Sequence, residues 1–125
     1  MKKITSLCTL VLLLFAGSLS VQAQEEVPKE VLLTTLNSVN TLGLSNLKTQ
    51  ELMEYNSGFV DKVYDIIDSD KSDKDKGKAL DTLNNSKEKD LLDLLDKKHF
   101  KKYVKLMEDQ LKPLIKKNKL LKHIV

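Results

Sequence analysis

Apolar residues recur at spacings of three and four along most of this chain, with charged residues between them. Such spacing is typical of helices that bury one face, whereas a half-buried strand shows a period of two, and that alternation is missing here. The sequence therefore predicts an all-α protein of about four helices, and long helices of this sort usually pair as antiparallel hairpins.

The first predicted helix is short and the second is long. The first begins near Pro28, whose fixed φ suits a first helical position, and ends at Gly43 in the manner of a C-terminal cap. The second begins at Ser45, a favourable N-cap, and runs to about Asp68. The apolar stripe of the first is Val31, Leu32, Leu36 and Val39, and that of the second is Leu52, Tyr55, Asn56, Phe59, Val60, Val63, Ile66 and Ile67.

The third predicted helix follows a polar turn and leads into the fourth. Ser72, with Asp75 three residues later, resembles a capping box at the start of the third helix. Asp96 is the predicted N-cap of the fourth helix, and Pro113 predicts a kink or restart because it removes a backbone donor. Residues 113–125 are then a Lys-rich apolar tail. The buried stripes are Ala79, Leu80, Leu83, Leu91, Leu94 and Leu95, and then Phe100, Tyr103, Val104, Met107 and Leu111.

The N-terminus has the three parts of a secretory signal. Two lysines precede an apolar run over residues 4–19, and the small residues of Val21-Gln22-Ala23 suit signal peptidase. We expect residues 1–23 to be removed and residues 24–125 to be a single exported domain, in the periplasm or outside the cell. The sole cysteine, Cys8, lies in the signal, so the predicted mature chain has no disulfide, thiolate nucleophile or cysteine metal site.

Charge is distributed unevenly along the predicted mature chain. Residues 24–96 carry 9 lysines against 16 acidic residues, and residues 97–125 carry 10 lysines against 2. Opposite charges of this kind attract within a hairpin or across a dimer, and narrow apolar stripes on so short a chain favour a homodimer. The basic part also suits anionic membrane, lipopolysaccharide or acidic proteins. Every basic residue is Lys, and the absence of Arg argues against specific nucleic-acid binding.

No arrangement of residues indicates catalysis or a metal. Asp68, Asp70 and Ser72 stand at positions one, three and five of a possible calcium loop, but the loop lacks its glycine at position six and its glutamate at position twelve. The separation of His99 and His123 matches no short metal motif. The carboxylates lie among lysines, where nothing would raise their pKa as a general acid requires. We expect no enzyme activity, metal or cofactor.

Two segments share a Leu, an N-cap residue and a long polar side chain three residues after the cap: Leu44, Ser45 and Lys48, and then Leu95, Asp96 and His99. They resemble the repeated LTxxQ motif of the Spy/CpxP-like periplasmic proteins, and residues 100–103 are similar to an aromatic-Lys-Lys-Tyr-like stretch that often follows the second motif. Only the Leu is unchanged in both copies. Ser and Asp replace Thr but still accept from the backbone, whereas Lys and His replace Gln.

The resemblance implies an ATP-independent chaperone or an envelope-stress accessory protein, usually a dimeric cradle with a concave client-binding face. The residues themselves favour client binding by the fourth helix, where charge and apolar contact combine: Lys97, Lys98, Lys101, Lys102 and Lys105, with Phe100, Tyr103 and Met107. Two alternatives stay open. One is a module that binds a single envelope partner, and the other is a surface-active protein whose tail from Pro113 lies on anionic membrane or lipopolysaccharide.

Overall fold

The computed structural model describes residues 26–125 and contains only helices over that range. The elements are α2 (Lys29–Leu36), the 3-10 helix η1 (Asn40–Leu42), α3 (Asn46–Ile67), α4 (Asp73–Lys117) and the 3-10 helix η2 (Lys119–Ile124). The all-α prediction is confirmed. Within residues 26–125, no helix combines the length and apolarity needed to cross a bilayer. The predicted signal peptide, residues 1–23, lies outside the described residues.

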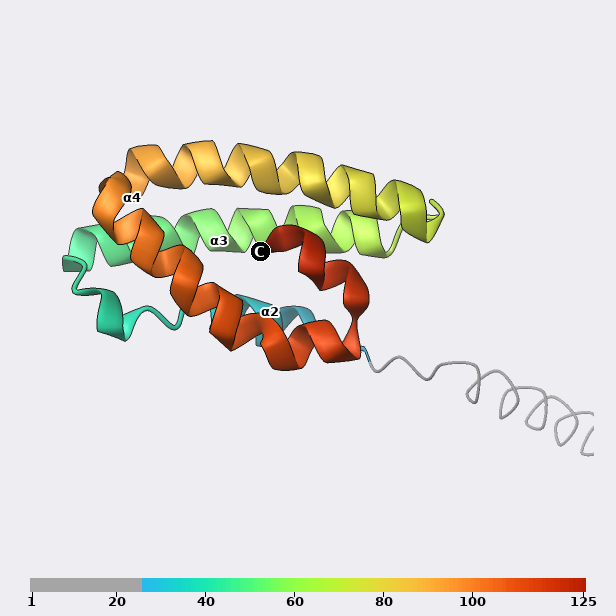
Figure 1. Ribbon diagram of the computed structural model, residues 1–125, viewed down its shortest axis with the longest axis horizontal. Coiled ribbons are helices and arrows are strands. Elements are labelled where there is room, and N and C mark those ends of the chain that lie inside the picture. Colours follow the sequence, from blue (N-terminus) through green and yellow to red (C-terminus); the bar gives the residue numbers. More distant parts are fainter. Residues whose placement is uncertain (1–25) are drawn as a thin grey trace, which may run out of the picture.

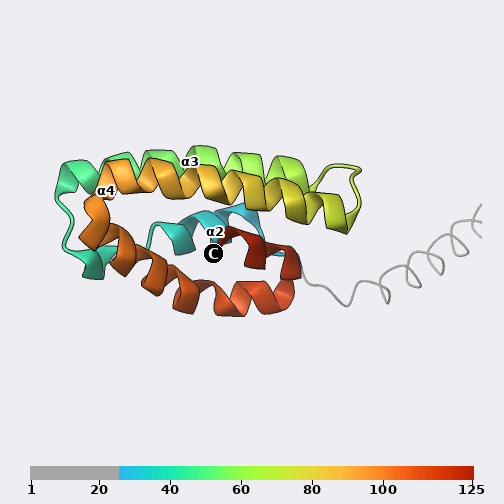
Figure 2. The same ribbon diagram turned by 45° about the horizontal axis from the view of Figure 1, so that its top comes forward.

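Helix α4 bends sharply at Asp96, the one position inside it with non-helical backbone angles. We call residues 73–95 the first arm and residues 97–117 the second arm. The first arm lies beside α3, and the second arm runs back along the other side of the molecule (Figure 1). Figure 2 shows α2 and the C-terminal segment between this pair and the second arm. The inner side of the bent helix is therefore occupied by α2 and the C-terminal segment.

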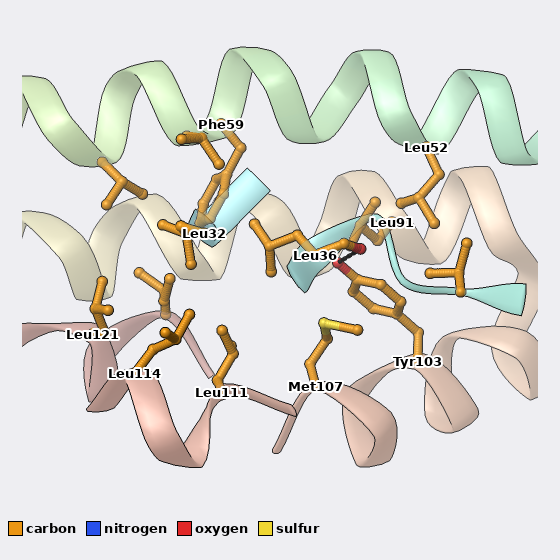
Figure 3. Packing of buried hydrophobic residues seen from close by; sticks show 14 of the residues in the cluster. Leu32, Leu36, Leu52, Phe59, Leu91, Tyr103, Met107, Leu111, Leu114 and Leu121 are labelled. Atoms are coloured by element: carbon orange, nitrogen blue, oxygen red, sulfur yellow. Dashed lines mark hydrogen bonds between the residues drawn. The ribbon is translucent and has the colours of Figure 1, made fainter. Parts of the chain in front are cut away.

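The core lies around α2. Leu32 and Leu36 of α2 are completely buried, and they meet side chains from α3, both arms of α4 and η2 (Figure 3). Burying one such leucine stabilises the fold by about 1.5–3 kcal/mol relative to leaving it exposed. The side chains around them include Leu52, Phe59, Leu91, Tyr103, Met107, Leu111, Leu114 and Leu121.

Helix α2 ends at Leu36, seven residues before the predicted end at Gly43. The hydroxyls of Thr35 and Ser38 donate to the carbonyls four residues earlier, at 2.8 and 2.9 Å. Bonds of this kind offer the backbone an alternative to the helix and lower helix propensity. The chain then forms η1, after which Gly43 adopts a left-handed φ of 71°. Gly43 therefore closes the short 3-10 helix instead of α2.

The helix does not restart at Pro113, as one of the two predicted outcomes required, because α4 continues through it to Lys117. Pro113 lies on the exposed side of the helix, where water can serve the carbonyl that loses its backbone donor. The chain turns at Asn118 instead, and the following 3-10 helix buries Leu121 and Ile124 completely. Residues 113–125 thus pack onto the rest of the fold, with Leu114, Leu121 and Ile124 in the core.

The C-terminal segment lies against the first arm of α4 at a glycine. A Cβ atom on Gly77 would come within 2.8 Å of His123 Nε2, so a side chain at this position would require the His123 ring to shift. The His123 ring in turn lies 2.7 Å from the Asp81 carboxylate, measured from Nδ1 to Oδ1. Gly77 and Asp81 together fix the position of η2 on the first arm.

Candidate functional site

The first motif-like segment is a helix start. Ser45 is the N-cap of α3, with extended backbone angles, and its Oγ accepts a hydrogen bond of 3.2 Å from the Lys48 amide. Leu44 is half-buried and packs against the core. The bond satisfies one of the amides that a helix N-terminus leaves without an intrahelical partner.

The second motif-like segment is the bend of α4. Asp96 Oδ1 accepts from the His99 amide at 3.0 Å, and Oδ2 lies 2.9 Å from His99 Nδ1. The hydrogen bond from the His99 amide is the main cause that lowers the pKa of the Asp96 carboxyl. Asp96 has φ 65° and ψ 166°, and no other non-glycine residue in the described range has a positive φ. This region is essentially restricted to glycine, so the bend is strained as well as capped.

The five lysines predicted to bind clients are all exposed. We call Lys97, Lys98, Lys101, Lys102 and Lys105 the basic patch. Phe100 lies among them and is half-buried against the core. The second arm of α4 therefore presents dense positive charge beside one partly accessible aromatic ring.

Tyr103 and Met107 do not belong to this surface. They are 1% and 3% exposed, so the prediction that they contact clients is wrong for this fold. They face α2, and the Tyr103 hydroxyl donates to the Leu36 carbonyl at 3.5 Å (Figure 3). Burial raises the pKa of Tyr103. Their helical spacing is compatible with a core role and with a client-binding role. Both side chains are buried in the core because α2 lies against the inner side of the second arm.

A small cavity separates the two arms of α4 beneath Phe100. Its volume is about 20 Å³, which is room for roughly one water molecule. Ligand pockets usually measure about 300–1,000 Å³. The cavity is therefore too small for an organic ligand. Its lining includes Leu91, Val104, Met107 and Ile124, with Asn84, Lys87 and Glu88 among the polar members.

Lys87 is a buried cation that the sequence interpretation missed. Its side chain donates to the Ile124 carbonyl at 2.8 Å, and Nζ lies 4.8 Å from the centre of the Phe59 ring. Burial lowers its pKa to about 8. Next to it, Asn84 Oδ1 is buried without a hydrogen-bond partner. The signal was present in the spacing, since positions 84 and 87 continue the buried stripe between Leu80 and Leu91.

An acidic groove lies on the other side, between α3 and the first arm. It measures about 500 Å³ and is lined by Glu51, Glu54, Tyr55, Asp90, Asp93 and Leu94. The Tyr55 hydroxyl donates to Asp90 Oδ2 at 2.7 Å, and burial, followed by this bond, raises the Tyr55 pKa. Across residues 26–125, no three His, Cys, Asp or Glu side chains come close enough together to hold a metal ion. The two histidines pair separately, His99 with Asp96 and His123 with Asp81.

Comparison with known proteins finds no matching family model, no matching curated protein and no matching solved structure. The resemblance to Spy/CpxP-like proteins therefore stays a prediction. In the structure, the two segments that carry it are the N-terminus of α3 and the bend of α4.

Proposed function

We propose that this protein is an exported, non-catalytic binding protein of the cell envelope that acts as an ATP-independent chaperone or envelope-stress accessory protein. The observation that supports this proposal is the basic patch, five exposed lysines around the half-buried Phe100. Charge attracts an acidic polypeptide at long range, and contact with an aromatic ring then slows its release. The partners are unfolded or envelope proteins.

Client contact centres on one side of the second arm. Phe100 and Val104 are half-buried and are one turn apart, with Lys97 and Lys101 exposed beside them. The apolar area that remains accessible is small because Tyr103 and Met107 are buried. Binding is therefore weak, reversible and sensitive to salt, as a chaperone that works without nucleotide requires.

The test measures aggregation of several unrelated unfolding proteins at equimolar ratio without ATP. We expect the wild type to suppress it at low salt and Lys97→Glu/Lys101→Glu to suppress it less. The matched control is Lys74→Glu/Lys78→Glu, which changes net charge equally at exposed positions of the first arm. Equal loss in both variants, or no suppression by the wild type, would contradict the proposal.

A second candidate is a module for one specific envelope partner. It is favoured by the scattered distribution of large exposed apolar side chains, none of which lies on the second arm: Val31, Leu47, Met53 and Leu92. A binder of many clients usually presents a continuous apolar patch. A protein that leaves unrelated clients to aggregate, yet retains one envelope protein through Lys97 and Lys101, would fit this candidate.

We also propose that the protein forms a homodimer. A 100-residue domain with narrow apolar stripes gains from covering apolar surface with a second copy. Sedimentation equilibrium over a range of concentrations tests this, and a single species of monomer mass throughout would contradict it.

A further inference from the structure

Lysines form a straight line along the outer face of the second arm. We call Lys98, Lys101, Lys105, Lys112 and Lys116 the lysine stripe, and all five are exposed. Their spacings of three, four, seven and four keep them on one helix face. At 1.5 Å per residue the stripe is about 27 Å long. The opposite face of the same helix holds the buried side chains Tyr103, Met107, Leu111 and Leu114.

The charges of the stripe are largely uncompensated. Lys112 lies 3.4 Å from the exposed Asp109 carboxylate. The other four stripe lysines have no ion-pair partner in the part of the chain that the structure describes. Figures 1 and 2 show the second arm at the edge of the molecule, with α2 and the C-terminal segment on its inner side. The stripe therefore faces outward.

We infer that the lysine stripe docks the protein on an anionic lipid bilayer without inserting into it. A straight line of exposed charge along one helix face fits a flat anionic surface, because all five lysines can reach that surface at once. Lys is a hydrated point charge that needs no fixed geometry, and Arg, which favours bidentate binding of individual groups, is absent from the chain. Clusters of four to eight basic residues on a helix are typical of binding to anionic lipid headgroups.

Insertion is excluded by where the apolar residues lie. Leu121 and Ile124 are completely buried, and Leu114 is 8% exposed. The predicted docking of the tail through its apolar side chains would thus require this part of the core to open. The large apolar side chains that are exposed in the described residues all lie outside the second arm, so binding of the stripe to the bilayer is electrostatic and disappears at high salt.

The experiment is co-sedimentation of the purified protein with vesicles of phosphatidylglycerol and phosphatidylcholine in equal parts. Pure phosphatidylcholine vesicles are the neutral arm. We expect binding to the anionic vesicles at about 0.01 M salt and its loss at about 0.5 M. Each surface lysine contributes roughly a fivefold gain in affinity, so Lys98→Glu/Lys105→Glu/Lys112→Glu weakens binding by at least about 100-fold.

The matched control is Lys74→Glu/Lys78→Glu/Lys89→Glu on the first arm, which has the same net charge and loses much less affinity. If the reversed charges disturb the fold, Lys98→Gln/Lys105→Gln/Lys112→Gln replaces them with neutral side chains. This variant retains the fold and also weakens binding. Equal binding to neutral vesicles, or equal loss in stripe and control variants, would overturn the inference. So would a protein that ignores anionic vesicles but binds polyglutamate through these lysines. The stripe shares Lys98, Lys101 and Lys105 with the basic patch, but the proposed chaperone activity is measured without lipid, so the failure of either proposal is distinguishable from the failure of the other.

Discussion

The two arms of α4 differ in whether they bury a lysine. The second arm carries eight lysines against two acidic residues, yet it buries only apolar side chains and Tyr103. The first arm has nearly balanced charge, yet it buries Lys87 and Asn84. The difference shows that the density of charge in a segment does not determine which charge is buried. Position on the helix decides it, because Lys87 lies in register with Leu80 and Leu91 under the C-terminal segment.

The burial of Lys87 in the first arm is tested most strongly by the pH dependence of the free energy of unfolding. In the unfolded chain the pKa of Lys87 has its ordinary value of 10.5, whereas burial lowers the pKa to about 8 in the folded protein. Between these values the unfolded chain binds more protons, so the free energy of unfolding rises with pH. We expect a rise of up to about 3 kcal/mol, measured by denaturant unfolding from about pH 7 to pH 10.

Lys87→Met removes this rise, because the variant has no buried group that must lose a proton. Lys101→Met on the second arm is the control, and it keeps the rise. The series ends near pH 10 because buried tyrosines act in the opposite direction above it: burial raises the pKa of Tyr64 to about 12. A wild type whose stability is the same at pH 7 and pH 10 would show that Lys87 is hydrated in solution.

The bend that separates the arms comes next in expected effect. Asp96→Ala removes the cap of the second arm and the contact with His99 but keeps a Cβ at φ 65°. Asp96→Gly removes the same contacts and also relieves the backbone strain. We expect both to lower the denaturant midpoint, with Ala lowering it further than Gly. The reverse order would mean that the positive φ at Asp96 costs little.

The N-cap of α3, Ser45, is comparable with the Asp96 cap but has no backbone strain. Ser45 makes one cap bond with ordinary extended angles, and Gly43 supplies the positive φ two residues earlier. Ser45→Ala should lower the free energy of unfolding by about 1 kcal/mol, the usual loss for an N-cap. Asp96→Ala should exceed it when both are measured in the same denaturant series. An equal effect would make the two caps equivalent despite their different backbones.

Single lysines of the second arm have the smallest expected effect. Lys98→Gln and Lys105→Gln lie on the exposed face, away from the core, so each should change the free energy of unfolding by less than about 0.5 kcal/mol. Thermal melting of the two variants beside the wild type measures this. A larger loss of stability would mean that these exposed lysines make stabilising contacts.

The sequence predicted the helices well and their packing less well. The caps at Ser45 and Ser72 and the bend at Asp96 follow from local hydrogen bonding, which neighbouring residues determine. The early end of α2 also has a local cause, but Thr and Ser hydroxyls bond either to the helix or to water, and the sequence does not decide between them. The folding back of residues 119–124 depends on contacts with Gly77 and Lys87, some 40 residues earlier.

The candidate site shows the same division. The exposed lysines of the basic patch were predictable, since they lie opposite the apolar stripe of the second arm. The burial of Tyr103 and Met107 was not, because a Met or aromatic stripe serves a core and a client surface equally well. Only the placement of α2 against the second arm decides between these roles. Lys87 was predictable from its register with Leu91, and the abundance of exposed lysines concealed it.

The burial of Leu121 and Ile124 has a consequence for the order of folding. A ribosome delivers the chain from its N-terminus, so α2, α3 and both arms of α4 emerge before the segment that covers their shared core. Until then, Lys87 has no carbonyl at position 124 to bind and the first arm exposes its apolar face. The native core therefore closes only after synthesis of residues 26–124 is complete.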